Sequence, residues 1–262
     1  MKKCGLTEVA TGQYEDTTTT AAYIWSEENW QHDDYLHSHN RHQLTYVSEG
    51  YQYFHIGQRI YLVPQHHAIW IPSKVSHRIT SNAETVDLLL LLFQEVPAEA
   101  FYNEVHIFPV PDVLKEMLLY ARKWNRQTTA TQAQASFLSA LLYNLPAMCN
   151  ESNGLQIPVP HDIRLLPIVE YLNKHYAYAM DLPLLAEKTA LSVRTLQRIF
   201  KQETGITIQK YAQLIRILKS IEFINSKQYT LSEVAYKVGY KSLSAFTAAY
   251  YTLMKSKPKL LK

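Results

Sequence analysis

The feature that most constrains this chain is a pair of similar segments in its C-terminal part. Each has apolar positions, a short turn, a serine and further apolar positions, at an offset of 49 residues before the turn and 50 after it: Leu182, Leu185, Ala186, Ser192, Leu196 and Phe200, then Leu231, Val234, Ala235, Ser242, Phe246 and Tyr250. A short helix, a tight turn and an N-capping serine that begins a longer helix make up the helix-turn-helix motif. We therefore predict two such motifs, separated by a long helix from Thr207 to about Asn225.

The second helix of the first motif carries side chains suited to DNA. It reads SVRTLQRIFKQETG, and Gly205 is expected to end it in the left-handed conformation. With the apolar residues packed inward, the other faces present Arg194, Gln197, Arg198 and Lys201. Arginine and glutamine can bind base edges in the major groove, and lysine suits phosphate. A solvated polar face is the alternative, but two motifs in a basic segment favour DNA.

Charge is distributed unevenly along the chain. Residues 161–262 contain 16 Lys and Arg against 7 Asp and Glu, a formal charge of +9, whereas residues 1–160 contain 10 against 16, a charge of −6. Nine of the eleven histidines lie in the acidic part. This contrast predicts different partners for the two parts, with nucleic acid the natural partner of the basic one.

The N-terminal part has the pattern of short strands. Between residues 21 and 92, aromatic and β-branched stretches alternate with turn residues, as in AAYIW, QLTYVSEG, YQYFHIGQRIYLVP, AIWIP and HRIT. Such spacing favours an antiparallel sandwich or barrel. The run LLLLLF at 88–93 is too short to cross a bilayer and is expected to be a buried strand.

After residue 93 the apolar period becomes helical. Two helices are expected near 113–125 and 133–149, and residues 150–160 have the composition of a linker. The sequence thus predicts a two-domain α+β protein, with an antiparallel β-barrel and following helices, then an all-α domain. The expected parts are a tail at 1–20, the barrel at 21–105, helices at 106–150, a linker at 151–160 and the double helix-turn-helix domain at 161–262.

The C-terminal segments resemble the AraC/XylS family of bacterial transcription regulators. LAEKTALSVRTLQRIFKQETGITIQKY and LSEVAYKVGYKSLSAFTAAY are similar to its two helix-turn-helix halves, and the resemblance covers about residues 163–262. In that family both recognition helices enter successive major grooves on one face of the DNA. The resemblance implies a double-stranded DNA operator as partner and places Arg194, Gln197 and Arg198 at base-reading positions.

The second motif departs from the family pattern. Ala248 stands where the family often has arginine, Lys255 where it often has glycine, and Tyr251 and Thr252 where basic residues usually follow. We therefore expect sequence specificity to depend mainly on the first motif. The full set of predicted DNA-binding residues is Ser192, Arg194, Thr195, Gln197, Arg198, Lys201, Lys241, Ser242, Ser244 and Thr247.

A histidine-rich segment marks the N-terminal part. In HSHNRHQLTYVSEG, the residues His37, His39 and Gln43 share the parity of one strand, and His77 follows in PSKVSH. This pattern resembles the cupin barrel, with Gln43 in place of the usual glutamate and Lys74 in place of a glycine. Many AraC-type regulators carry such a barrel as effector domain, so we expect these four residues to line a small-molecule effector pocket.

Three histidines and an amide could also hold a divalent transition metal, because neutral imidazole is a good ligand. No cofactor is expected to be required. The alternative function is a metal-dependent cupin enzyme, a dioxygenase or isomerase, fused to a DNA-binding domain. Gln43 argues against this enzyme because the site lacks a negatively charged ligand. We therefore predict a regulator and no catalytic residues.

The remaining expectations concern location and assembly. No apolar stretch follows the basic start MKK, and Cys4 and Cys149 form no disulfide framework, so a cytoplasmic protein without a membrane partner is expected. The apolar faces of the helices at 106–150 favour a homodimer, with packing inside one chain as the alternative. RNA polymerase is a further candidate partner.

Overall fold

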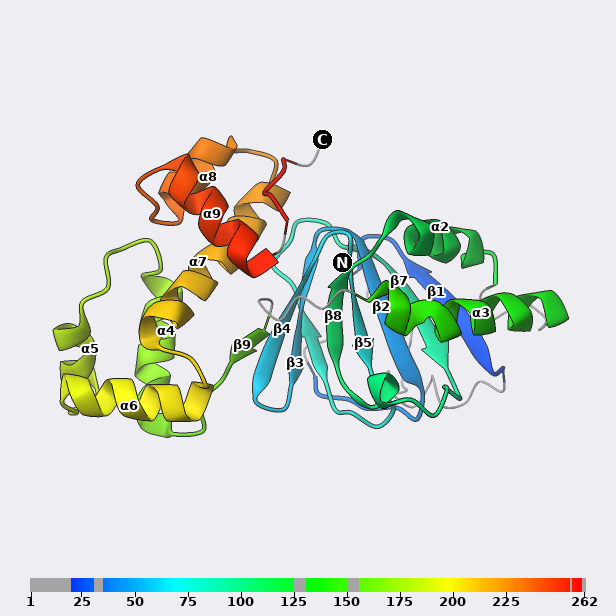
Figure 1. Ribbon diagram of the computed structural model, residues 1–262, viewed down its shortest axis with the longest axis horizontal. Helices are drawn as coiled ribbons and strands as arrows, with labels where there is room; N and C mark the ends of the chain where they lie inside the picture. Colours follow the sequence, from blue (N-terminus) through cyan, green and yellow to red (C-terminus); the bar gives the residue numbers. More distant parts are fainter. Residues whose placement is uncertain (1–19, 31–34, 125–130, 150–155, 255, 261–262) are drawn as a thin grey trace. The chain divides into compact units, whose positions relative to one another are not determined.

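The computed structural model describes residues 20–30, 35–124, 131–149, 156–254 and 256–260 (Figure 1). The predicted tail up to residue 19, the first half of the predicted linker and Lys255 lie outside these ranges. The chain forms two compact units: residues 1–57 with 63–152, and residues 58–62 with 153–262. The predicted order of an antiparallel β domain followed by a helical domain is confirmed.

A five-stranded sheet is the centre of the first unit. Its strand order is β1-β7-β2-β5-β8, formed by Ala22–Glu27, Asp87–Phe93, His42–Glu49, His67–Ile71 and His106–Pro109. All of the neighbouring strands are antiparallel. The apolar run at 88–93 lies in β7, between β1 and β2, which explains why it is nearly continuous: residues on both faces are buried.

Helices cover one face of this sheet. They are α2 (Asp112–Ala121) and α3 (Gln132–Met148), and they share one apolar core with Trp70 and Tyr102. A short 3₁₀ helix, η1 (Ala100–Asn103), supplies Tyr102, whose hydroxyl donates to the Leu142 carbonyl of α3. The buried face of α2 is Leu114, Leu118 and Ala121. Val113, by contrast, is 57% exposed.

The sequence predicted that the segment 106–150 is helical, but the segment also contains a strand. Its first four residues form β8, which pairs with β5 from His67↔Pro109 to Trp70↔His106. Phe108 thereby joins the core at 0% exposure. Four residues are too few for a strand to be distinguished from the start of a helix by period alone.

The remaining strands lie outside the five-stranded sheet. In the first unit, β3 (Tyr51–Ile56) pairs antiparallel with β6 (Arg78–Thr80). In the second unit, the first residues of β4 (Arg59–Pro64) pair antiparallel with β9 (Gln156–Pro158). The predicted linker therefore contains a strand, because its apolar Ile157 is buried opposite Ile60.

The rest of the second unit is helical, and its long helix α7 (Ile208–Asn225) supplies the central packing surface. Ten residues of α7 are buried, and α4, α6, α8 and α9 all contact this helix. The other helices are η3 (Ile163–Leu165), α4 (Leu166–Lys174), α5 (Leu182–Lys188), α6 (Val193–Thr204), α8 (Leu231–Lys237) and α9 (Leu243–Met254). Of the helices in the described ranges, none has the length and apolar character needed to cross a bilayer.

Candidate nucleic-acid interface and histidine cluster

The first predicted helix-turn-helix is formed by α5 and α6. Ser192 caps α6, since its hydroxyl accepts from the Thr195 backbone N–H at 3.2 Å, and Gly205 ends the helix with a φ of +75°. Leu196 and Phe200 are fully buried against the rest of the unit. The apolar positions expected from the sequence therefore hold α6 in place, and its opposite side faces solvent.

The second predicted motif is formed by α8 and α9. A capping box begins α8: the hydroxyl of Thr230 accepts from the Glu233 backbone N–H, and the Glu233 carboxylate accepts from the Thr230 backbone N–H at 2.8 Å. Ser242 caps α9, because its hydroxyl accepts from the Ala245 backbone N–H at 3.2 Å. Phe246 is fully buried, as Leu196 is in the first motif.

The turns of the two motifs have the same hydrogen bond. The backbone N–H of Leu191 donates to Ala186 at 3.1 Å, and that of Tyr240 donates to Ala235 at 2.9 Å. These pairs are equivalent in the repeat at an offset of 49 residues. The two segments are thus repeats in three dimensions, with α6 and α9 at corresponding positions.

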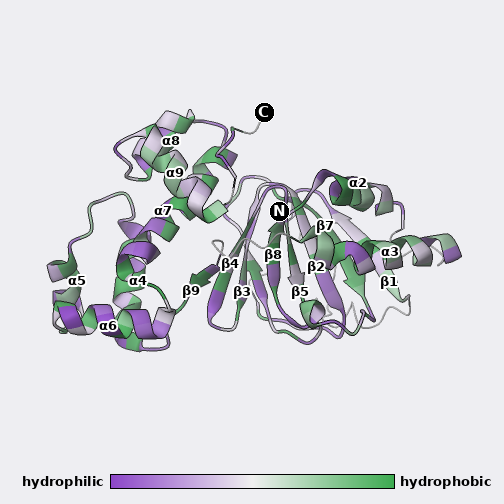
Figure 2. Cartoon of the chain, in the orientation of Figure 1, coloured by the Kyte–Doolittle hydropathy of each residue, from purple (hydrophilic) through white to green (hydrophobic). Residues whose placement is uncertain are grey.

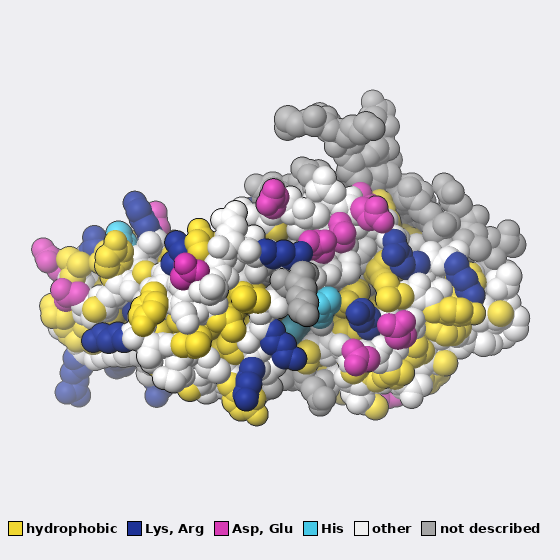
Figure 3. All heavy atoms as spheres, turned by 90° about the horizontal axis from the view of Figure 1, so that it is seen from above, with side chains coloured by type: hydrophobic (Ala, Val, Ile, Leu, Met, Phe, Trp, Pro, Cys, Tyr) yellow, Lys and Arg dark blue, Asp and Glu magenta, His cyan; other side chains and the backbone are white. Residues whose placement is uncertain are grey.

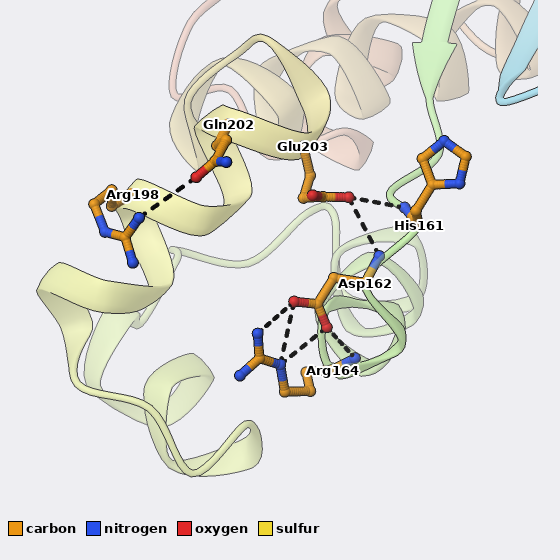
Figure 4. A network of polar contacts seen from close by, with 6 residues as sticks. All are labelled: His161, Asp162, Arg164, Arg198, Gln202 and Glu203. Carbon is orange, nitrogen blue, oxygen red and sulfur yellow. Dashed lines mark hydrogen bonds and ion pairs between the residues drawn. The ribbon is translucent and has the colours of Figure 1, made fainter.

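The predicted DNA-binding residues of α6 lie on its outer side. Arg194, Arg198 and Lys201 are exposed, and Gln197 is partly buried. Arg198 donates to the side-chain oxygen of Gln202 at 3.4 Å, a bond that keeps the guanidinium along the helix surface (Figure 4). Lysine and arginine side chains also project from the helical unit in the space-filling view (Figure 3).

The predicted residues of the second motif carry less charge. Lys241 and Ser244 are exposed, whereas Ser242 and Thr247 are partly buried. The hydroxyl oxygens of Ser242 and Ser244 are 3.1 Å apart and share a hydrogen bond. In the first motif, the hydroxyls of Ser192 and Thr195 are bonded in the same way at 2.9 Å. DNA contact by the ten residues stays a prediction.

Three histidines come together in the first unit. One ring nitrogen each of His37, His39 and His77 lies within 4.8 Å of the others, and the rings of His37 and His77 are 4.3 Å apart between centroids. Gln43 extends the group, with its side-chain oxygen 2.9 Å from Nε2 of His39. The structure therefore brings together all four residues that the sequence predicted for the pocket.

The prediction that His37, His39 and Gln43 lie on one common strand was wrong. Strand β2 begins at His42, and His37 instead forms an isolated bridge with His77, through N–H to carbonyl bonds of 3.0 and 2.8 Å. The backbone N–H of Lys74 donates to the His39 carbonyl at 2.8 Å. Lys74 has a φ of +64°, a left-handed conformation that glycine adopts most easily, and it stands where the cupin pattern has glycine.

Hydrogen bonds orient two of the imidazoles. Nδ1 of His39 donates to the Arg41 carbonyl and Nδ1 of His77 donates to the Val75 carbonyl, both at 2.9 Å. Each neutral ring then presents a lone pair at Nε2, as metal-binding histidines do when a backbone carbonyl holds the other nitrogen. Burial, together with the neighbouring His37 and His39, lowers the pKa of His77 to about 3, against the opposing effect of its hydrogen bond to the Val75 carbonyl. His77 is therefore neutral at physiological pH.

The donor set fits a divalent transition metal in part. Nε2 of His77 is buried without a hydrogen-bond partner in the described residues, and the lone pairs of His39 Nε2 and Gln43 Oε1 face each other at 2.9 Å. A cation between such lone pairs relieves their repulsion, and reversal of the Gln43 amide does the same without an ion. Imidazole suits zinc, copper, iron or nickel, but the set contains no carboxylate.

Comparison with known proteins agrees with both units. A model described as a helix-turn-helix domain matches residues 185–261, and one described as an AraC-like ligand binding domain matches residues 19–146. The chain belongs to the AraC/XylS family. This family assignment, predicted from the two helix-turn-helix segments, is confirmed, and the protein is a transcription regulator with a ligand-binding and a DNA-binding domain.

Several AraC-type proteins are similar to this regulator. The transcriptional regulator NimR of Escherichia coli is 26% identical over 219 residues, 82% of this chain and 77% of NimR. The transcriptional activator RhaS of Salmonella schwarzengrund is 27% identical over 110 residues, 42% of this chain and 40% of RhaS. Among solved structures, ToxT from Vibrio cholerae has a TM-score of 0.37 at 12% identity, over 91% of this chain and 97% of ToxT.

One feature of this AraC-type DNA-binding domain was missed by the sequence analysis. Glu203, near the end of α6, accepts hydrogen bonds from the backbone N–H groups of His161 and Asp162 at 3.1 and 3.3 Å (Figure 4). Asp162 forms an ion pair with Arg164 at 2.6 Å, which lowers the pKa of the Asp162 carboxyl. The start of the domain is thus bonded to α6. Separation by more than 40 residues hides this contact from any local pattern.

Proposed function

We propose that this regulator binds its operator through α6 and α9, which enter successive major grooves, and that α6 supplies most of the base specificity. The observation that supports the proposal is the repeated geometry: two helices begin at equivalent serines, bury equivalent aromatic or aliphatic residues and expose the opposite side. On α6 that side carries Arg194, Gln197 and Arg198 for base edges and Lys201 for phosphate.

Selection of binding sites from random DNA by the full chain tests this proposal. The expected product is a site with two half-sites about 34 Å, one helical turn, apart. One half-site should be sharply specified and should contain guanine or adenine at the positions contacted by α6. If no sequence is enriched, or if the bound sequences contain a single half-site, the proposal is wrong.

We further propose that His37, His39, Gln43 and His77 line the effector pocket of the ligand-binding domain. Buried imidazoles with lone pairs at Nε2, together with an amide, suit a small polar ligand that donates hydrogen bonds. A divalent transition metal held by the three histidines is the second candidate, and it would supply a Lewis-acid centre to which an effector could coordinate. We propose no required cofactor and no enzymatic activity, because the amide of Gln43 stands where a catalytic cupin site has a carboxylate.

Metal analysis separates these candidates. The regulator is purified without chelator and its zinc, nickel, copper and iron contents are measured, with and without dialysis against EDTA. Stoichiometric metal would favour the metal-bound pocket, whereas a metal-free protein that retains effector-dependent DNA binding would favour the polar pocket. If wild type turns over a substrate and the His39→Ala variant does not, the alternative of a cupin enzyme would be favoured.

For assembly, we propose a homodimer formed through the helices at 106–150, between the sensing domain at 21–105 and the linker at 151–160. Exposed apolar side chains on α2 and α3 support this: Val113 is 57%, Tyr120 56% and Tyr143 65% exposed. A DNA operator also implies a cytoplasmic location and makes RNA polymerase a candidate partner. Analytical ultracentrifugation at micromolar concentration, free and on DNA, tests the dimer, and monomers in both conditions would contradict it.

A further inference from the structure

The outer side of α9 differs in chemistry from that of α6. At the repeat offset of 50 residues, the four charged or amide side chains of α6 that are predicted to bind DNA have small, hydroxyl or aromatic counterparts in the second motif: Arg194 with Ser244, Gln197 with Thr247, Arg198 with Ala248 and Lys201 with Tyr251. The helix positions correspond, but the side chains that can donate two hydrogen bonds to one base are absent from α9. Direct readout by bidentate bonds is therefore confined to α6.

The exposed side of α9 is largely apolar. Leu243 is 39% and Tyr251 54% exposed, and both line a shallow groove with Ser244, Thr247, Ala248 and Lys257. In the hydropathy view, α9 is pale and green, whereas α6 carries strongly hydrophilic stretches (Figure 2). Leu243 is the first residue of the helix, the part of a recognition helix that approaches base edges.

One basic residue lines this apolar groove, and another lies near it in the sequence. Lys241 lies just before α9, Lys257 lines the groove, and both are exposed. Along the whole of α9 there is no charged residue, so its face itself offers no ion pairs. A lysine beside an uncharged, methyl-bearing groove matches a ligand that presents both phosphates and apolar groups.

The major groove of DNA has one apolar group at its base edges, the C5-methyl of thymine, and contact with alanine or with the threonine methyl group is a known way to recognise it. We propose that α9 recognises thymine methyl groups through Leu243, Thr247 and Ala248, so that the second half-site is rich in A·T pairs. This inference rests on the proposed function, and it names the chemistry that the second motif recognises.

Replacement of thymine by deoxyuridine in the operator tests the inference, because it removes only the methyl group. The probe is the duplex selected from random sequence, with uracil placed either in the half-site contacted by α6 or in the one contacted by α9. In the α9 half-site, each lost methyl contact should weaken binding about fourfold, the effect expected for burial of one such group. In the α6 half-site the affinity should change less than twofold, since the hydrogen bonds of arginine and glutamine to guanine and adenine remain.

A variant of the protein provides the second arm. Thr247→Ser removes the side-chain methyl and keeps the hydroxyl, so it should reduce the thymine-over-uracil preference of the α9 half-site. Thr252→Ser is the matched control: the same change lies on the last turns of α9, outside the groove residues, with a hydroxyl already bonded to the Ala248 carbonyl at 2.9 Å. Its preference should equal that of wild type.

The outcomes are distinguishable. Equal affinity for thymine and uracil duplexes, or a second half-site rich in G·C pairs, would overturn the thymine inference while the proposed DNA-binding function stands. Absence of any selected duplex would instead overturn the proposed function. Uracil sensitivity that persists in Thr247→Ser and in Leu243→Ala alike would show that these two residues do not recognise the methyl groups and would also overturn this assignment.

Discussion

Ala190 and Gly239 occupy the same place in the two helix-turn-helix turns, one residue before the N–H groups that close them. Both have left-handed backbones, with φ of +53° and +86°. Glycine takes this conformation without strain, whereas an alanine side chain costs about 1–2 kcal/mol there. The first turn is therefore strained where the second is not.

We expect Ala190→Gly to stabilise the DNA-binding domain. After allowance for the greater entropy of glycine in the unfolded chain, the gain should be about 0.5–1 kcal/mol. Urea unfolding at constant pH measures it. Gly239→Ala is the opposite control, since an added Cβ would lie 2.3 Å from the Ala177 carbonyl oxygen, and it should destabilise the domain. A loss of stability in Ala190→Gly would contradict the strain argument.

Substitutions on the outer side of α6 should affect DNA binding in two different ways. Arg198→Ala and Gln197→Ala should each cost about 1–3 kcal/mol of specific binding and relax the preference at one base position. Lys201→Ala should weaken all sequences alike and lower the slope of log affinity against log salt by about 1. Equilibrium binding across salt concentrations and operator variants checks this. Unchanged operator affinity in Arg198→Ala would show that α6 is not the base-reading helix.

His39→Ala should leave the effector-free DNA affinity within about twofold of wild type, because the histidine cluster and the DNA-binding residues belong to different units. The response to effector should change, since a ligand shifts an equilibrium only through its different affinities for two states. If the cluster holds a metal, added Zn²⁺ should raise the melting temperature of wild type and not of His39→Ala. His42→Ala, outside the cluster, is the control. If both His39→Ala and His77→Ala responded to effector and metal as wild type does, these histidines would not line the effector pocket.

Stability should depend on pH through His67. Burial lowers the pKa of His67 to about 4, against the opposing effect of its hydrogen bond to the Gln65 carbonyl. Since this value is below that of the unfolded chain, about 6.5, the unfolded state binds the proton first as pH falls. Stability is then complete above pH 6.5 and is lost towards pH 4, by up to about 1.4 kcal/mol per pH unit.

The replacement His67→Asn should flatten this slope. Unfolding free energies of wild type and variant, measured by denaturant titration at pH 7, 6 and 5, provide the comparison. The two curves should converge at low pH as wild type loses its advantage. Parallel curves would mean that His67 does not titrate in this range.

The sequence alone determined the DNA-binding domain. A helix-turn-helix is a local structure: its capping serines, turn residues and apolar spacing lie within about 25 residues, so Ser192, Leu196 and Gly205 act as predicted. The alternating strands of the N-terminal domain were also visible, because period 2 reflects burial of one face. Local patterns identified the elements, and the family resemblance supplied their order and role.

Tertiary structure decided the contacts between residues far apart in sequence. The four-residue strand β8 exists because it pairs with β5, and β9 because it pairs with β4, in a segment whose composition suggested a linker. His37 reaches His77 through a backbone bridge that no strand parity predicts, and Glu203 binds the backbone of His161 and Asp162 from a helix 41 or 42 residues away. Hydrogen bonds formed across such distances depend on how the whole domain folds, which a periodicity over a few residues does not contain.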